Sequence, residues 1–465
     1  MATASPLELG TKPIGKLLVR YSVPAIIASV VTSLYNIVDS IFIGQGVGAL
    51  AITGLAITFP LMNLVIAFVT VLAVGGSTIA SIYLGQKDIE KAEDTLSTLV
   101  VLSLVHSVVF GGLALIFLDP ILTLFGATPE TLPYARDFMQ IILLGTPVAY
   151  IFISLNNLMR ATGYPTKAMI SAIVSVVVNI ALAPIFIFQL GWGIRGAAIA
   201  TLIGQACACV WVLWHFFSPK SYIRFKRGTN WHKASIIKHI YAIGLSPFII
   251  NVCACVVVMF INKTLLSYGA EEGNMAVGAY GIVNRVTMFF LMIVLGVTQG
   301  MQPILGYNFG AGQWGRVKRT LWIGIWIGAA ITIVGFAICE LFPDFVTRMF
   351  TSDEVLIRHS RQGFRIIMLC FPLIGAAIVI QNFFQSIGKP QLSIFLSMTR
   401  QLIYLLPLLW LFSRLWGLDG VWLSMAASDF LSFVTTVVTL WVVMRKFNRL
   451  HANSTATAGG TADSV

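Results

Sequence analysis

Twelve long apolar runs constrain this chain more than any other feature of its sequence. A window of about 19 residues detects membrane-spanning helices. It finds runs at 16–43, 50–82, 96–118, 138–158, 167–189, 196–217, 240–266, 276–306, 321–341, 364–384, 391–413 and 420–444. A helix needs ~20 mostly apolar residues to cross the hydrocarbon core of a bilayer. The runs therefore predict an all-α integral membrane protein with twelve transmembrane helices.

Composition excludes a soluble globular domain. Hydrophobic residues make up 57% of the chain and charged residues 10%, whereas a soluble domain is typically about 25% charged. The net charge of +12 does not indicate nucleic acid, because the basic residues lie in short loops between the apolar runs. The lipid bilayer is therefore the expected partner.

The distribution of Lys and Arg predicts the orientation. Of the 30 basic residues, twenty fall on the side that holds both termini, seven on the other side and three inside the runs. Short cytoplasmic loops carry the excess of Lys and Arg, so we expect both termini in the cytoplasm of a multi-pass plasma (inner) membrane protein. On this assignment 218–239 is a basic cytoplasmic linker, and the Ser/Thr/Ala/Gly-rich 451–465 is predicted to be a disordered tail.

No feature of the sequence indicates an enzyme. No Asp-x-x-Asp or His-Glu-x-x-His pair occurs inside the apolar runs, and a membrane-embedded transferase would need clustered acids or histidines near one face. The six cysteines all lie in apolar runs and are interpreted as packing residues rather than disulfides or metal ligands. We expect no cofactor and no resident metal.

An internal repeat with an offset of 223 to 225 residues extends through the whole chain. Examples are Phe125 and Phe350, Pro147 and Pro372, Gly163-x-Pro165 and Gly388-x-Pro390, and Trp192-Gly193 and Trp416-Gly417. So many matches in one register predict two homologous six-helix lobes, at 1–217 and 240–450. Six is even, so both lobes start on the same side, and a pseudo-twofold axis along the membrane normal relates them. Two such bundles suit an alternating-access carrier.

Asp39 is the one acidic residue inside the first-half runs. It lies near the end of 16–43, so its side chain is expected at membrane depth. A charge there costs roughly 2.5–3.5 kcal/mol on insertion scales, and such residues mark ion pathways and proton relays. The simpler interpretation, a neutral acid that only packs helices, is the weaker one.

Four motifs together resemble the multidrug and toxic compound extrusion (MATE) family, and within it the DinF/MepA-like branch. They are Tyr35-Asn36-x-x-Asp39, Asn179-Ile180, Gly300-Met301-Gln302-Pro303-x-x-Gly306-Tyr307-Asn308, and Asn382-x-x-Gln385-x-x-Gly388-x-Pro390 with its first-half counterpart from Asn157 to Pro165. The resemblance covers all twelve runs. It implies an antiporter that exchanges H⁺ or Na⁺ for organic, often cationic and amphipathic compounds.

The resemblance also implies a cation site in the first lobe. Asp39, Asn179 and Thr201 match its positions, and Tyr35 and Asn36 are placed beside them to donate or relay hydrogen bonds. Many relatives carry an acid four residues after Asn179, where this chain has Ala183. Na⁺ gains from a second carboxylate, whereas proton coupling needs only one acid with a shifted pKa, so H⁺ is favoured. Na⁺ at Asp39, Asn179 and Thr201 is the alternative.

Further residues inside the runs have predicted roles. Pro24 is the expected bending point of the first helix. Arg400 and Asp429 are predicted to form a structural ion pair. His106 is interpreted as a hydrogen-bonded packing residue, with proton carrier as the alternative. The predicted lining of the substrate cavity is Asn157, Gln302, Asn284, Arg285 and Gln381.

The function predicted from the sequence is a cation-coupled exporter of small organic compounds that acts as a monomer. The alternative is a flippase for a lipid-linked precursor with the same broad fold. Such a flippase would need several cationic residues along its cavity, and the runs contain few. A non-transporting scaffold is disfavoured by the intramembrane Asp39.

Overall fold

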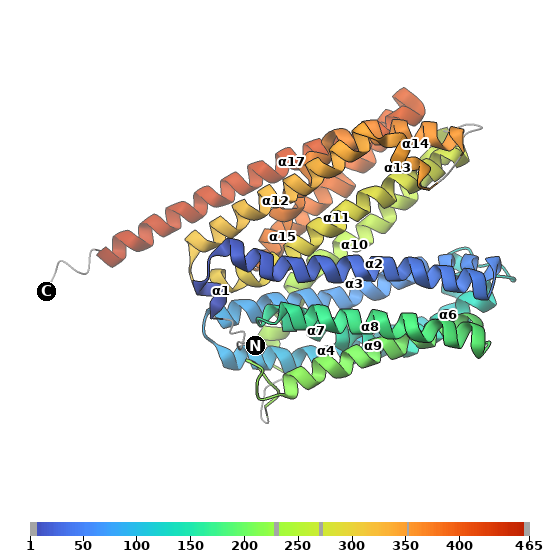
Figure 1. Cartoon of the computed structure of the whole chain (residues 1–465). Helices are drawn as coiled ribbons and strands as arrows, with labels where there is room; N and C mark the ends of the chain where they lie inside the picture. The colour runs from blue at the N-terminus through green and yellow to red at the C-terminus, as the bar shows by residue number, and fades with distance from the viewer. Residues whose placement is uncertain (1–6, 227–231, 269–272, 351–352, 460–465) are drawn as a thin grey trace. The chain divides into compact units, whose positions relative to one another are not determined.

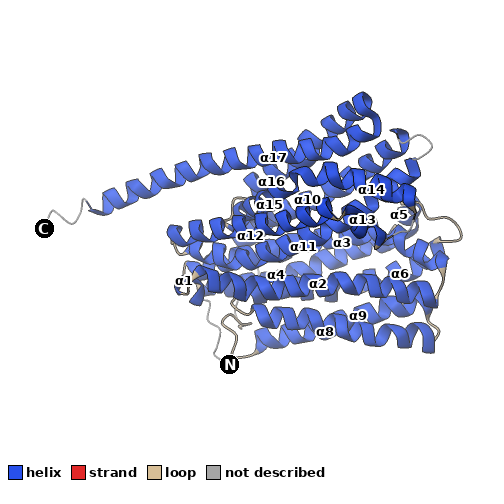
Figure 2. Cartoon of the chain, turned by 45° about the horizontal axis from the view of Figure 1, so that its top comes forward, coloured by secondary structure: helices blue, strands red, loops and turns tan. Residues whose placement is uncertain are grey.

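Every regular element in the described part of the chain is a helix (Figure 2). A computed structural model describes residues 7–226, 232–268, 273–350 and 353–459. Inside the helices, the side chains at 36, 37, 49, 266, 268, 273–275 and 446–459 lie outside this description. The predicted all-α class is confirmed.

The helices run Glu8–Thr11 (α1), Ile14–Gly46 (α2), Ala49–Gly85 (α3), Ile89–Ile116 (α4), Leu118–Leu124 (α5), Leu132–Leu144 (α6), Thr146–Ala161 (α7), Pro165–Pro184 (α8), Gly193–Phe217 (α9), Ala234–Tyr268 (α10), Gly273–Gly310 (α11), Trp314–Leu341 (α12), Pro343–Arg348 (α13), Glu354–Ile367 (α14), Phe371–Ser386 (α15), Pro390–Met398 (α16) and Leu406–Gly459 (α17). Two π-helical segments, Ile185–Gln189 (η1) and Thr399–Leu405 (η4), continue α8 and α16, and a 3₁₀ turn, Met368–Cys370 (η3), joins α14 to α15. Figure 1 traces their order along the chain.

The number of spans agrees with the prediction. In the described residues, ten helices are long and apolar enough to cross a membrane, and the bent pair α6–α7 supplies an eleventh span. The last of these stretches, Pro390–Arg445, is 56 residues long and contains a break at Gly417, whose φ is 58°. This left-handed conformation is one that glycine adopts without strain. Gly417 therefore separates the predicted runs 391–413 and 420–444, and the total is twelve.

The fourth span differs from the single run predicted at 138–158. It consists of α6 and α7, which meet at an angle of 56°. Gly145 lies at the junction, and Pro147 lies in the first turn of α7, where its missing N–H costs no hydrogen bond. The proline that the sequence placed inside a span thus starts a new helix.

The C-terminal end also differs from the prediction. α17 continues to Gly459, so residues 451–459 of the predicted disordered tail 451–465 are helical, and 460–465 lie outside the described residues. Three alanines in 451–459 favour the helix, since Ala has the highest helix propensity.

The chain forms two compact units. Unit 1 comprises Met1–Val256, Phe289–Ile327 and Asn382–Ile394, and unit 2 comprises Val257–Met288, Gly328–Gln381 and Phe395–Val465. These units do not follow the predicted lobe boundaries, and the lobes 1–217 and 240–450 stay a prediction. Close contacts inside unit 1 explain its extent: a Cβ at Gly75 would lie 2.1 Å from the Ile240 carbonyl oxygen, and one at Gly244 would lie 1.9 Å from that of Val71.

The parts of α3 and α11 that belong to unit 1 approach each other closely, and each helix contributes a glycine to the contact. A Cβ at Gly85 would lie 2.0 Å from the carbonyl oxygen of Tyr307, and a Cβ at Gly310 would lie 2.1 Å from that of Ile82. The offset from Ile82 to Tyr307 equals the offset from Gly85 to Gly310. Each repeat thus presents the same surface to the other, as a twofold relation requires. Such close backbone approach is how small residues pack membrane helices.

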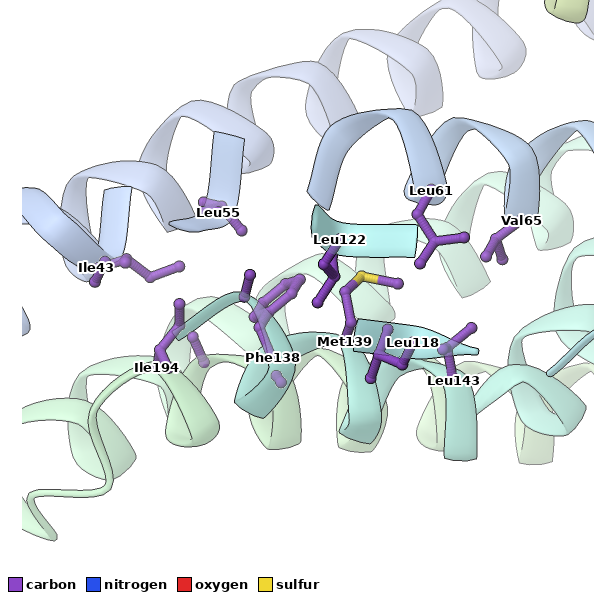
Figure 3. Close-up of a cluster of buried hydrophobic side chains, with 14 of the residues drawn as sticks. Ile43, Leu55, Leu61, Val65, Leu118, Leu122, Phe138, Met139, Leu143 and Ile194 are labelled. Atoms are coloured by element: carbon purple, nitrogen blue, oxygen red, sulfur yellow. The ribbon is translucent and has the colours of Figure 1, made fainter. Parts of the chain in front are cut away.

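An apolar cluster fills the part of unit 1 that lies toward the C-terminal end of α2 (Figure 3). Leu118 and Leu122 of α5, and Phe138, Met139 and Leu143 of α6, pack there on residues of α2, α3 and α9. The fully buried Ile43 of α2 belongs to it. These apolar side chains form the core at this end of the unit.

Ion pairs fasten the predicted linker 218–239 to α4. The Lys226 ammonium lies 2.6 Å from the Glu93 carboxylate, and the Lys233 ammonium lies 2.5 Å from that of Asp94. Both carboxylates are buried. The hydrogen bond to Asp94 raises the pKa of Lys233. Residues 227–231 of the linker lie outside the described residues.

Candidate functional site

The candidate site begins on α2, where Tyr35 and Asp39 are one helical turn apart and share a face. Asp39 is buried, with 8% of its surface exposed, and Tyr35 is partly buried. The side chain of Asn36, the third residue predicted on this helix, lies outside the described residues. α2 packs against α8 and α9, which bring the remaining members of the site.

Gly204 allows α8 and α9 to approach closely beside the site. A Cβ there would lie 2.4 Å from the Ser175 carbonyl oxygen and 3.5 Å from the Asn179 Cβ. The close approach lets the Asn179 amide of α8 reach the Thr201 hydroxyl of α9, with an Nδ2–Oγ1 distance of 2.9 Å. Asn179 itself is 3% exposed.

Tyr35, Asn179 and Thr201 form one hydrogen-bonded network. The Thr201 hydroxyl donates to the Ala197 carbonyl oxygen over 3.1 Å. It accepts from the Asn179 amide, and it lies 3.0 Å from the Tyr35 hydroxyl. Since the single Thr201 proton is already used, Tyr35 donates. A hydroxyl has two acceptor lone pairs, so those of Thr201 are filled.

Asp39 stands beside this network with an unsatisfied oxygen. Among the described residues, its buried Oδ1 has no hydrogen-bond partner, and no ion pair joins the carboxylate to a described Lys, Arg or His. A buried carboxylate without a counterion is costly. The charge is therefore best neutralised by a proton or by a bound cation.

Ala183 occupies the position where the resemblance implies a second acid. It is fully buried and belongs to the apolar cluster together with Ile43, Ile187 and Ile194. Since Ile43 follows Asp39 by one turn of α2, the cluster covers the site toward the C-terminal end of that helix. The surroundings of Ala183 are therefore apolar.

The residues predicted to line a substrate cavity are divided between the two units. Gln302 is buried in unit 1, where its amide donates to Ser77 over 2.9 Å and to Thr78 over 2.6 Å. Asn157, also in unit 1, donates to the carbonyl oxygen one turn back in its own helix. Gln302 therefore takes part in the contact between α3 and α11.

The other three predicted cavity residues, Asn284, Arg285 and Gln381, belong to unit 2. Arg285 is exposed and Asn284 is partly buried. Gln381 is buried; its Oε1 accepts from Ser397 over 3.4 Å, and its Nε2 has no partner among the described residues. The amide of Gln381 is the member of this group that can still donate a hydrogen bond.

Arg160 is a polar site that the sequence did not reveal. It was counted among the basic residues outside the membrane, yet only 8% of it is exposed. Its guanidinium donates to the Gln299 amide oxygen of α11 and, over 3.3 Å, to that of Asn156. The internal repeat is the sequence feature that points to a polar side chain here, because the position of Arg160 corresponds to that of Gln385 in the second half. Gln299 and Asn156 are both neutral, which makes this a buried polar contact rather than an ion pair.

His106 is hydrogen-bonded in the packing of unit 1. Its Nε2 lies 2.6 Å from the Tyr241 hydroxyl of α10. Its Nδ1 is buried and has no partner among the described residues. His106 is therefore hydrogen-bonded as expected, and the choice between packing residue and proton carrier stays a prediction.

Arg400 and Asp429 form an ion pair within unit 2. The Arg400 Nε donates to Asp429 Oδ1 over 2.6 Å, and the Arg400 backbone carbonyl accepts from Ser428 over 2.6 Å. Asp429 is 8% exposed. Arg400 lies in the π-helical η4, a widened turn of the kind often found at functional sites.

Pro24 lies inside α2, which continues through it as one helix from Ile14 to Gly46. α11 packs closely on both sides of the proline: a Cβ at Gly300 would lie 2.5 Å from the Ser22 nitrogen, and one at Gly296 would lie 2.8 Å from the Ile26 Cα. The Ser22 hydroxyl donates to the Val297 carbonyl oxygen over 3.3 Å. The segment around Pro24 is thus in contact with α11.

Twelve spans and an internal duplication define the class of this protein: a polytopic helical membrane protein made of two repeats. The MatE family model matches the chain twice, over 24–185 and 247–411. The two matches begin 223 residues apart, in agreement with the repeat offset. The chain belongs to the MatE family, a family of membrane transporters.

Similar proteins extend over nearly the whole chain. The multidrug export protein MepA of Staphylococcus haemolyticus (strain JCSC1435) is 28% identical over 436 residues, which cover 94% of each chain. A solved structure described as a complex of the MATE multidrug transporter DinF-BH is 38% identical, with a TM-score of 0.85 over 93% of this chain and 96% of that one. A MATE structure in a bent conformation has a TM-score of 0.90 at 24% identity over 97% of this chain and 100% of that one, and shows the fold.

Proposed function

We propose that this protein is a proton-coupled antiporter that exports organic, often cationic and amphipathic compounds by alternating access. The observation that carries the proposal is the buried Asp39 carboxylate, whose Oδ1 has no hydrogen-bond partner among the described residues. Intramembrane acids of this kind occur on ion pathways. We also place both termini in the cytoplasm of a plasma membrane, on the distribution of Lys and Arg.

The substrate class rests on the relatives. MepA is named as a multidrug export protein, and DinF-BH is described as a multidrug transporter. The chain aligns with both over more than nine-tenths of its length. We therefore assign small organic compounds as the exported substrates. No observation favours the flippase alternative.

Two features favour H⁺ over Na⁺ as the coupling ion. Ala183 lies in an apolar cluster, so no second carboxylate is present there. Thr201 already accepts two hydrogen bonds, and its oxygen has no lone pair left for a metal ion in this arrangement. A proton needs only the one carboxylate of Asp39.

Coupling follows from differential affinity of two conformations. With Asp39 charged, the hydroxyl and amide groups of Tyr35, Asn179 and Thr201 can turn toward the carboxylate. When Asp39 is protonated, the carboxylate charge that attracts these groups is lost. α2 then bends at Pro24, where the proline has already removed one backbone hydrogen bond. Bending reshapes the first-half cavity and releases the substrate outward.

Dye efflux measured in everted membrane vesicles tests the proposal. An imposed pH gradient without Na⁺ should drive transport, and adding Na⁺ should change the rate little. Transport that requires a Na⁺ gradient and ignores the pH gradient would overturn proton coupling. Absence of transport of any organic cation under both gradients would overturn the substrate class.

A further inference from the structure

A basic cavity at the start of α2 has no role in the transport site. Its volume is about 310 Å³, and it is lined by Lys12, Pro13, Lys16, Leu17 and Arg20. Its lining surface is mostly apolar between the three cationic side chains. All five residues belong to unit 1, and Asp39 lies several turns further along the helix.

The cavity carries excess positive charge. Glu8 is the acid that balances part of it, with an ion pair of 3.0 Å to Lys12 and a second to Arg20. Three cations and one carboxylate leave two positive charges. The Lys16 ammonium makes no hydrogen bond or ion pair in the described ranges of the chain and is exposed. The site is therefore prepared for an anion.

An apolar stripe continues from the cavity along the same face of α2. At about 100° per residue, Lys16, Arg20, Val23, Ile27 and Leu34 lie within a sector of roughly 60°. Val23 is 44% exposed, Ile27 41% and Leu34 57%. A single ligand that covers both parts must carry an anionic head and a long apolar tail.

We propose that this cavity and stripe bind one anionic phospholipid, with its phosphate group between Lys12, Lys16 and Arg20 and an acyl chain along Val23, Ile27 and Leu34. Basic pockets at the cytoplasmic side of membrane helices are suited to such head groups. A volume of about 310 Å³ is at the lower end of the roughly 300–1,000 Å³ found for small-molecule pockets and is sufficient for a phosphoglycerol head. The apolar stripe distinguishes a lipid from free phosphate.

Binding of lipid to the purified full-length protein in detergent tests this site, with native mass spectrometry as the readout. The two probes are palmitoyl-oleoyl phosphatidylglycerol and the phosphatidylcholine with the same chains. We expect tighter binding of phosphatidylglycerol. Lys16→Gln should weaken that binding about fivefold, as expected for one basic residue near a membrane surface at ~1 kcal/mol, and Lys16→Arg should preserve it. Neither variant should change phosphatidylcholine binding.

The matched control is Lys238→Gln. Lys238 is also an exposed lysine of unit 1, on α10, outside the cavity, and its substitution removes the same charge. Equal weakening by Lys16→Gln and Lys238→Gln would overturn the site in favour of general surface charge. Equal affinity for the two lipids, or inorganic phosphate that displaces phosphatidylglycerol at millimolar concentration, would overturn the lipid as its occupant.

Discussion

Asp39 and Asp429 are two intramembrane acids of equal burial, each 8% exposed, in opposite electrostatic situations. Asp429 lies 2.6 Å from the Arg400 guanidinium, whereas Asp39 Oδ1 has no hydrogen-bond partner among the described residues. Burial penalises both charges, but only Asp429 is compensated by an opposite charge. Burial alone therefore does not identify a coupling residue: the uncompensated acid can exchange a proton at low cost, and the paired acid stabilises the fold.

The largest effect is expected for Asp39→Asn. Coupled efflux in everted vesicles should fall to the background of empty vesicles, because the variant has no carboxylate to protonate at this site. Expression and thermal stability should stay close to wild type, since the amide is neutral and has nearly the same size. Asp137→Asn, which removes a partly buried acidic partner of the exposed Arg195, is the control and should transport normally. Wild-type efflux by Asp39→Asn would refute the role of Asp39.

Removing the charge of Asp429, the paired acid, should destabilise the protein rather than abolish transport. Asp429→Asn leaves Arg400 unpaired, and we expect a loss of about 3 kcal/mol, at the low end of the range for buried pairs, because the Arg400 side chain is 28% exposed. Thermal unfolding in detergent measures it. The double reversal Arg400→Asp with Asp429→Arg should recover part of the loss. Strictly additive losses would show that the pair contributes nothing jointly.

Substrate affinity should depend on pH only when Asp39 is present. Wild-type protein should bind substrate about tenfold more weakly at about pH 5 than at about pH 9, a difference of ~1.4 kcal/mol, because protonation of Asp39 favours the releasing conformation. Asp39→Asn should give a flat profile, which fluorescence titration in detergent can measure. If the two profiles coincide, the titrating group lies elsewhere, and His106 and Asp429 become the candidates.

Tyr35→Phe should weaken coupling without removing it. The variant loses the hydroxyl that lies 3.0 Å from Thr201, and one hydrogen bond contributes about 1 kcal/mol net. We expect the efflux rate to fall about fivefold. Tyr404→Phe, which removes a 2.8 Å contact with Thr435 in unit 2, is the matched control and should leave the rate unchanged. Complete loss of transport in Tyr35→Phe would show that the hydroxyl itself carries the proton.

The smallest effect is expected at Asp88, a partly exposed acid outside the spans. Asp88 caps α4 by accepting from the Lys91 backbone N–H over 3.1 Å, and its second oxygen lies 2.6 Å from the Lys91 ammonium. The hydrogen bond from the Lys91 side chain is the main cause that lowers the pKa of Asp88. Its contribution to stability is therefore present above the unfolded pKa of about 3.9 and is lost as pH falls through the lower folded pKa.

Replacing Asp88 by Ala should accordingly cost about 1 kcal/mol near pH 7, as for other helix caps, and almost nothing at about pH 2. Thermal unfolding in detergent at the two pH values measures the difference. An equal cost at both would mean that the charge of Asp88 is not involved.

The membrane class, the twelve spans and the repeat could be predicted from the sequence, because each depends on local composition or on direct comparison of residues such as Gly163 and Gly388. The division of the fourth span into two separate helices, α6 and α7, could not be predicted from hydropathy, which reads through Gly145 as one run, although Pro147 marked a point where a helix bends or breaks. Nor could the burial of Arg160, because its partner Gln299 is 139 residues away. The helical course of 451–459 was also missed, as Ser, Thr and Gly there outweighed the alanines in the prediction.

Some features of the candidate site could likewise be predicted from the sequence, and others required the tertiary structure. The position of Asp39 at membrane depth follows from the sequence, as do the nearby Tyr35 on the same helical face and the apolar residue at Ala183. The hydrogen bonds of Thr201 do not, because they depend on the close approach of α8 and α9 at Gly204. Whether Thr201 can still bind a metal ion is decided by those bonds.

The sequence by itself determined that this protein is helical and spans a membrane twelve times, because in lipid each backbone N–H and C=O must be satisfied within its own segment. The sequence also predicts the pair of Arg400 and Asp429, but only the tertiary structure decided that these two side chains meet while other polar groups of the described residues stay unpaired. Asp429 meets Arg400, 29 residues earlier, whereas Asp39 meets no cation in the described residues. Pairing depends on which helices pack together and on the depth of each side chain in the membrane. Contacts between segments far apart in the chain set both.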